Sequence, residues 1–78
     1  MEYKCEVNFE TAKSMWRKTI ALPFVPMAGM YLIGIDNIGD AQCIMEVNWD
    51  CEKREFLIWF KEANVSDEGF AEAGWTQH

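Results

Sequence analysis

The stretch EFLIWFK, at residues 55–61, decides the fold that we predict for this chain. Successive residues of a β-strand point to opposite faces of the sheet, so a strand here would be apolar on both faces. One face would carry Phe56, Ile58 and Phe60, and the opposite face would carry Leu57 and Trp59. A strand of this kind is central in its sheet or is covered on both sides. We therefore expect residues 55–61 to form an inner strand.

Two segments near the start of the chain alternate between apolar and polar residues. Residues 3–9, YKCEVNF, predict a half-buried antiparallel strand with Cys5, Val7 and Phe9 facing inward. Residues 15–22, MWRKTIAL, predict a second strand that pairs with the first as a hairpin. A helix over residues 11–18 is the alternative, because some of its apolar residues also have helical spacing.

The middle of the chain predicts two more strands. Residues 30–35 are apolar at nearly every position, which favours a third strand that is buried on both faces. Residues 41–49 alternate, and the side chains expected on one face are Cys43, Met45, Val47 and Trp49. Asn and Gly at residues 36–40 and the charged run at residues 50–54 predict turns.

The tail predicts one short helix after residue 65. Ser66 is suited to cap its N-terminus, and Gly74 is suited to the left-handed conformation that ends many helices. Phe70 and Trp75 would then make the hydrophobic contact that accompanies a Schellman ending. Gly69 inside the helix counts against this prediction, because glycine is a poor helix former.

Together these elements predict an α+β, mostly β fold. We expect an antiparallel sheet, or a small barrel, of four to five strands with one short C-terminal helix, in a single domain of residues 1–78. The helix is too short to cover both faces of the sheet. A second apolar face therefore needs a curled sheet, a second copy or a partner to cover it, and the residues expected there are Tyr31, Ile33, Ile35, Ile44, Leu57 and Trp59.

Charge and composition exclude several classes of function. Thirteen acids against seven bases give a net charge of −6. Contact with nucleic-acid phosphates or anionic membranes needs clustered Lys and Arg, so we expect neither, and a basic protein partner fits the sign better. The N-terminal MEYKCEVNF does not resemble a signal peptide, and three cysteines do not make an even disulfide framework. We expect a cytoplasmic protein.

Motifs for catalysis or cofactor binding are missing from the sequence. The one histidine is His78, and the cysteines lack the paired spacing of zinc sites. Signatures for a serine nucleophile and glycine-rich phosphate loops are also missing. The acids fall on polar strand faces or in loops, where they are expected to be solvated. We therefore expect no enzyme activity, no catalytic residue, no metal and no cofactor.

Residues 20–35, IALPFVPMAGMYLIGI, form a stretch without a charged residue. It is shorter than the ~20 apolar residues of a membrane-spanning helix, and prolines and glycines interrupt it. We expect it to contain the end of one strand at residues 20–22, a stiff loop at residues 23–28 and a doubly buried strand at residues 29–35. In that loop Phe24, Val25 and Met27 either cap the protein's own core or bind a partner.

The leading hypothesis is a small acidic, non-catalytic binding protein that acts through protein–protein contact, including contact with a second copy. The residues expected to bind a partner are Phe24, Val25, Met27, Trp59, Asp67, Glu68 and Glu72. In size and composition the chain resembles the short acidic proteins that phages and mobile elements encode, including inhibitors such as anti-CRISPRs, which implies an inhibitor. The alternative is a small-ligand-binding β-barrel or accessory domain with an aromatic pocket formed by Trp16, Trp49 or Trp59.

Overall fold

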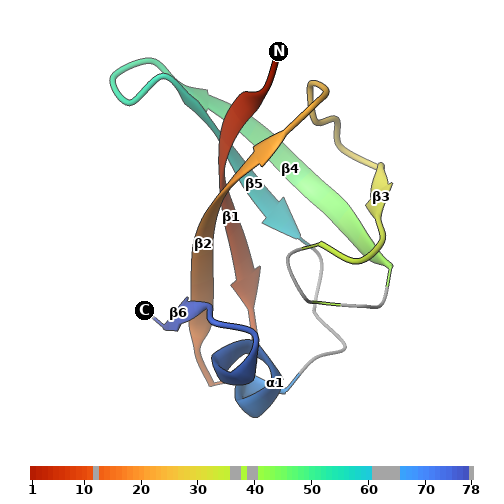
Figure 1. The fold of residues 1–78 in the computed structure, drawn as a ribbon, viewed down its shortest axis with the longest axis vertical. Coiled ribbons are helices and arrows are strands. Elements are labelled where there is room, and N and C mark those ends of the chain that lie inside the picture. Colours follow the sequence, from red (N-terminus) through yellow and green to blue (C-terminus); the bar gives the residue numbers. More distant parts are fainter. Residues whose placement is uncertain (12, 36–37, 39–40, 61–65, 78) are drawn as a thin grey trace.

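The computed structural model describes residues 1–11, 13–35, 38, 41–60 and 66–77. These residues form one sheet in the strand order β3-β4-β5-β1-β2-β6, together with one short helix of six residues (Figure 1). The elements are β1 (Tyr3–Glu10), β2 (Met15–Leu22), β3 (Tyr31–Leu32), β4 (Gln42–Asp50), β5 (Glu55–Phe60), α1 (Asp67–Glu72) and β6 (Thr76–Gln77). The α+β, mostly β class predicted from the sequence is confirmed.

The strand β5 is an inner strand, as its two apolar faces predict. It pairs with β4 through a hairpin and with β1 on its other side. β1 and β2 form the expected hairpin, in which Phe9 lies opposite Trp16, so the helical alternative for residues 11–18 is wrong. The pairing of β1 with β5 is parallel, with Cys5 opposite Phe56, whereas only antiparallel pairs were predicted. Apolar alternation predicts which face of a strand is buried, but not the direction of its neighbour.

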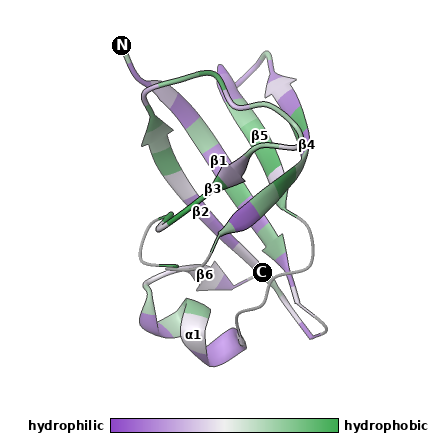
Figure 2. Ribbon diagram, turned by 90° about the vertical axis from the view of Figure 1, so that its right-hand side faces the viewer, coloured by the Kyte–Doolittle hydropathy of each residue, from purple (hydrophilic) through white to green (hydrophobic). Residues whose placement is uncertain are grey.

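The core lies on one face of the sheet, and several of its aromatic residues gather where α1 covers it. Phe9, whose side chain is fully buried, stacks on Phe60 with the ring centroids 4.4 Å apart. Phe70 of α1 and Trp75 pack against the same ring, at 5.1 and 5.3 Å. Trp16 of β2 stacks on Phe70 at 5.8 Å. This aromatic cluster attaches the helix to the end of the sheet, and Figure 2 shows α1 below the strands.

Both ends of α1 are as the sequence predicts. The Ser66 side chain accepts a hydrogen bond from the backbone N–H of Gly69, at 3.2 Å, as an N-cap does. At the other end Gly74 has φ +86°, in the left-handed region. Its N–H donates to Ala71, and the N–H of Trp75 donates to the carbonyl of Phe70, which together make the predicted Schellman ending.

The prediction of a doubly buried strand over residues 30–35 is wrong. Only Tyr31–Leu32 forms a strand, and the side chains of Tyr31 and Ile33 are 65% and 79% exposed. The segment was predicted to be buried because it is apolar. Tyr31 and Ile33 lie at the surface instead, whereas Met30 and Leu32 pack against the core and Ile35 is buried in it.

A β-bulge in β4 changes which of its side chains face the core. The register of β4 against β5 shifts between Ile44 and Glu46, so Ile44 is buried whereas Met45 is 55% exposed. The predicted single face of Cys43, Met45, Val47 and Trp49 is therefore wrong before the bulge, although Val47 and Trp49 do share a face. The predicted second apolar face is also wrong, because Ile35 and Ile44 belong to the core.

Most of the predicted turn at residues 36–40 lies outside the described residues. The turn that joins β4 to β5, at residues 51–54, is described and lies at the end of the sheet away from α1 (Figure 1). None of the described helices is long and apolar enough to cross a membrane.

Candidate functional site: an apolar surface at residues 20–35

The loop after β2 does not cap the core. Phe24, Val25 and Met27 are 37%, 47% and 64% exposed, whereas the backbone-stiffening Pro26 between them is buried. Pro26 therefore anchors the loop while its neighbours remain at the surface. Of the two alternatives that the sequence leaves for these three side chains, the structure has them exposed.

The same segment lines an open groove of about 620 Å³. Among the described residues, those that line it all come from the uncharged stretch, namely residues 20–22, Phe24 and residues 30–35. One wall is the end of β2, and the other is the segment that contains β3. We call this groove, together with the exposed side chains of Phe24, Val25, Met27, Tyr31 and Ile33, the 20–35 surface.

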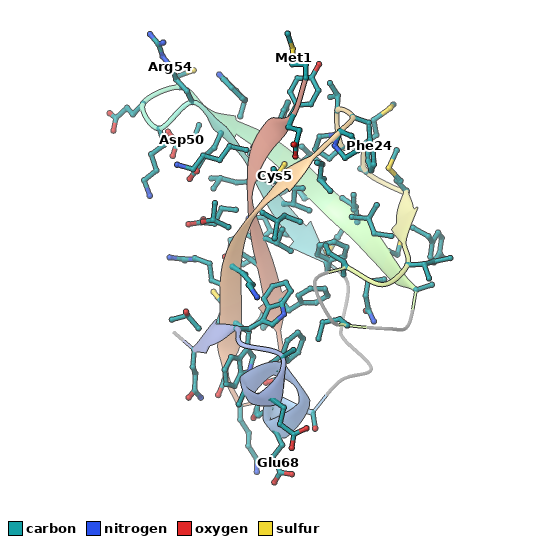
Figure 3. The ribbon with its side chains drawn as sticks, viewed as in Figure 1. Met1, Cys5, Phe24, Asp50, Arg54 and Glu68 are labelled. Atoms are coloured by element: carbon teal, nitrogen blue, oxygen red, sulfur yellow. The ribbon has the colours of Figure 1, made fainter. Side chains whose placement is uncertain are left out.

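The 20–35 surface carries no formal charge. The sequence has no Asp, Glu, Lys or Arg between Lys18 and Asp36, so no charged side chain comes from the segment that lines the groove. Figure 3 shows Phe24 beside the end of β2, far from Glu68 on α1. A surface of this kind gains most of its binding free energy from burial of apolar area rather than from ion pairs.

Trp59 lies on the other face of the sheet. It sits opposite Asn8 of β1 and Glu46 of β4, and it is partly exposed. Beside it, the fully buried Asn8 accepts a hydrogen bond from Arg17 Nε at 2.9 Å, and Arg17 also forms an ion pair with Glu6 at 3.5 Å. Trp59 therefore adjoins a polar network and does not extend the 20–35 surface.

None of the tryptophans expected to form an aromatic pocket lines the groove. Trp16 is buried beneath α1, and Trp49 is 52% exposed with its ring against Phe56 at 4.9 Å. The aromatic rings at the groove are those of Phe24 and Tyr31. The described lining of the groove therefore includes none of the three tryptophans, and a ligand pocket formed by them stays a prediction.

The acids of α1 do not act as one surface either. Asp67 is engaged within the protein, since its Oδ1 accepts hydrogen bonds from Trp16 Nε1 at 2.8 Å and from Thr11 Oγ1 at 2.7 Å. Glu68 and Glu72 are exposed on the helix, and Figure 3 shows Glu68 at the end of the molecule away from Phe24. Asp67 thus ties α1 to β2, and partner binding by the other two acids stays a prediction.

The hydrogen bonds to Asp67 predict that the stability of the folded protein depends on pH in the acid range. Donation from Trp16, then from Thr11, holds the pKa of Asp67 below its ordinary value of 3.8. A carboxylate with a lowered folded-state pKa stabilises the fold above its unfolded pKa, and this stabilisation is lost as pH falls through the folded value. We therefore expect Asp67→Asn, which keeps an acceptor oxygen, to be less stable than wild type at neutral pH. The difference should shrink below roughly pH 4.

Urea titrations at several pH values between about 7 and 2 measure this effect. Glu68→Gln removes a charge from the same helical turn without breaking a described contact, and it should leave the neutral-pH midpoint near that of wild type. If wild type and Asp67→Asn lost stability equally as the pH falls, Asp67 would not be the residue whose ionised side chain holds α1 to β2.

The cysteines and acids do not assemble a chemical centre in the described part of the chain. Cys5, Cys43 and Cys51 are all free thiols. Burial, followed by the nearby charge of Glu55, raises the pKa of the Cys5 thiol, which opposes formation of the reactive thiolate. Across the described residues no group of three or more His, Cys, Asp or Glu side chains is placed to hold a metal ion.

Tyr31 and Ile33 are the surface residues that sequence reasoning missed. They were expected to be buried with the rest of residues 30–35, yet they line the groove and are largely exposed. One signal could have pointed to them, because Gly29 and Gly34 flank the segment and both have positive φ. Turns at both ends leave room for only a very short strand.

Comparisons with protein-family models, with curated proteins and with solved structures find no significant match to this chain.

Proposed function

We propose that this protein is a small non-catalytic binding protein whose 20–35 surface contacts a protein partner. The observation that supports the proposal best is a groove of about 620 Å³ whose lining, among the described residues, is uncharged, together with the exposed side chains of the same segment. The five exposed side chains of this surface are 37% to 79% exposed, which for side chains of this size leaves an area on the order of 500 Å² in solvent. That is a large share of the roughly 800 Å² that one protein contributes to a standard interface.

The stiffness of the loop supports the same proposal. Pro23 and Pro26 fix two φ angles in a stretch of five residues, and Pro26 is buried. A loop that is already ordered loses little conformational entropy on binding. Aromatic and methionine side chains such as Phe24, Tyr31 and Met27 are also those enriched at the centres of interfaces.

The negative charge of the protein fits a partner that is basic in the region around the apolar contact. The chain carries a net charge of −6, and none of that charge comes from residues 20–35. Opposite charge on a partner accelerates encounter, while the apolar groove supplies the short-range contact. A small chain that covers a working surface of its partner inhibits that partner, so an inhibitor of the kind that phages and mobile elements encode stays our prediction.

The test is capture and cross-linking with the purified chain, followed by affinity measurement with the recovered partner. The variant carries Phe24→Asp and Met27→Asp, which take the net charge from −6 to −8 and place both new charges on the 20–35 surface. We expect at least a tenfold loss of affinity, because two apolar contacts are lost and two charges are desolvated.

The matched control is Lys13→Asp, which also takes the net charge from −6 to −8 but changes an exposed residue between β1 and β2. It should keep wild-type affinity if the surface, and not the total charge, determines binding. Equal affinity of wild type and the double variant would overturn the proposal. The solution mass of the free chain shows whether the partner is a second copy.

A small apolar ligand is the second candidate, because the groove volume lies within the roughly 300–1,000 Å³ of ligand pockets. Such a ligand would contact Phe24 and Tyr31. Its signature is a set of NMR shifts confined to residues 20–35 on titration with an apolar compound library. Those shifts should saturate, and they should vanish in Leu22→Asp.

A further inference from the structure

A second surface is formed by an unpaired edge of β4. β4 has nine residues, whereas its neighbour β3 has two and pairs only with Gln42 and Cys43. Two further backbone hydrogen bonds, each 2.8 Å, join Ile44 to Gly29 and Met30. The chain then turns away, with Met30 N–H donating to Met27 and Gly29 at φ +90°. Figure 1 shows β3 beside one end of β4 only.

Residues 46–50 of β4 therefore offer backbone groups on the side away from β5. Among the described residues, none forms a backbone hydrogen bond to this side of the strand. Five residues of extended chain span roughly 16 Å. An unpaired strand edge of this length is a template on which another extended segment can add as a strand.

The side chains of residues 46–50 differ between the two faces. Val47 and Trp49 lie opposite Ile58 and Phe56 and so share the core face. The Trp49 ring packs against Phe56 yet remains 52% exposed, at the free edge of the sheet. A strand added beside β4 would place its own apolar side chains against Val47 and Trp49.

The opposite face of this edge is acidic. Glu46 and Asp50 lie on it, four residues or roughly 13 Å apart. The ion pairs of the described residues join Lys4 to Glu55 and Arg17 to Glu6, so neither Glu46 nor Asp50 has a basic partner among them. Asp50 Oδ1 instead accepts two backbone N–H groups of the following turn, and Glu46 accepts from Asn48 at 3.1 Å.

Charge decides which occupant fits. A second copy paired through the same edge would bring Glu46 and Asp50 against the same acids, and like charges on neighbouring strands are destabilising. A strand with Lys or Arg at the two matching positions would complement both carboxylates. The positions between them would need apolar side chains opposite Val47 and Trp49.

We infer that residues 46–50 dock an extended segment of a partner protein, with basic residues at its first and fifth positions and apolar residues at its second and fourth. The segment adds as a new strand beside β4, along the length that β3 leaves unpaired. This edge shares no residue with the 20–35 surface, so the inference stands apart from the proposed function.

The test is an NMR titration of the full chain with a blocked synthetic peptide. When this peptide is extended, lysine and threonine alternate along one face and valine occupies the other face. We expect saturable amide shifts centred on residues 46–50. Glu46→Lys should weaken binding by about three- to tenfold, since an exposed attraction becomes a repulsion. A peptide with glutamate in place of lysine should show the reverse preference and bind Glu46→Lys better than wild type.

Backbone methylation separates strand addition from simple charge attraction. Two peptides carry N-methyl groups on alternate residues, one on the odd and one on the even positions. Only one edge of an added strand faces β4, so one of these peptides should lose binding and the other should retain it. Equal binding of both, shifts that map to residues 20–35, or no shift with any peptide would each overturn the inference.

Discussion

Replacing Phe9 by alanine is expected to remove about 3–5 kcal/mol from the free energy of unfolding, the usual cost of deleting a buried aromatic side chain. Phe9 is fully buried and packs against Phe60, Phe70 and Trp75, with centroid distances of 4.4, 5.1 and 5.3 Å. A domain of 78 residues has a total stability of roughly 4–12 kcal/mol. The variant should therefore be marginally folded at best.

Circular dichroism with urea titration measures this loss. Phe24→Ala is the matched control, because Phe24 is the same residue type on the 20–35 surface and is already 37% exposed. It should change stability by much less than Phe9→Ala and should weaken partner binding instead. Similar unfolding midpoints for the two variants would contradict the view that the aromatic cluster beneath α1 is the centre of the core.

The second large effect is expected at Asn8. Its side chain is fully buried on the polar side of the sheet, and its amide donates to the backbone carbonyls of Ile58 and Glu6, each at 3.4 Å. Its oxygen accepts from Arg17 Nε at 2.9 Å. Asn8→Ala leaves these groups without their partner, so we expect a loss of about 1–3 kcal/mol.

Two variants isolate the cause by urea titration. Asn48→Ala removes an exposed amide whose described hydrogen bond is to Glu46, and it should be close to neutral. Asn8→Leu fills a similar volume without polar atoms. If Asn8→Leu were as stable as wild type, packing and not hydrogen bonding would account for the stabilising effect of Asn8, and the polar network would have no stabilising role.

Much of the fold could be predicted from alternation because each hairpin is locally encoded. The faces of β1, β2 and β5 follow directly from residues such as Val7, Trp16 and Ile58, all of which are buried. The end of α1 follows from Gly74, since left-handed backbone at a helix end favours glycine. In these segments the polar and apolar residues point to one arrangement only.

The parts that could not be predicted depend on neighbours in space. The bulge between Ile44 and Glu46 shifts the faces of β4 by one residue, and nothing in the spacing of apolar residues indicates it. Asn8 is polar yet buried, because the sheet places the large side chains of Arg17 and Trp59 on either side of it. Burial of this kind arises only once the strands have paired.

The residues of the candidate site could also be predicted only in part, because sequence patterns indicate loops but not contacts between distant segments. Phe24, Val25 and Met27 were found because prolines indicate a surface loop, and all three are exposed. Tyr31 was missed because an uninterrupted apolar run looks the same whether it is buried or lines an open groove. Asp67 was assigned to the surface from its position in the helix, whereas its hydrogen bonds to Trp16 and Thr11 depend on the tertiary fold.

The parallel pairing of β1 with β5 also determines how the chain must fold. The hairpins β1–β2 and β4–β5 each close over a short turn, so both can form quickly and independently. They meet through one junction, where Cys5 lies opposite Phe56, fifty-one positions later in the chain. Closing so long a loop costs entropy before the core contacts repay it. The docking of two preformed hairpins is therefore the step expected to limit the folding rate.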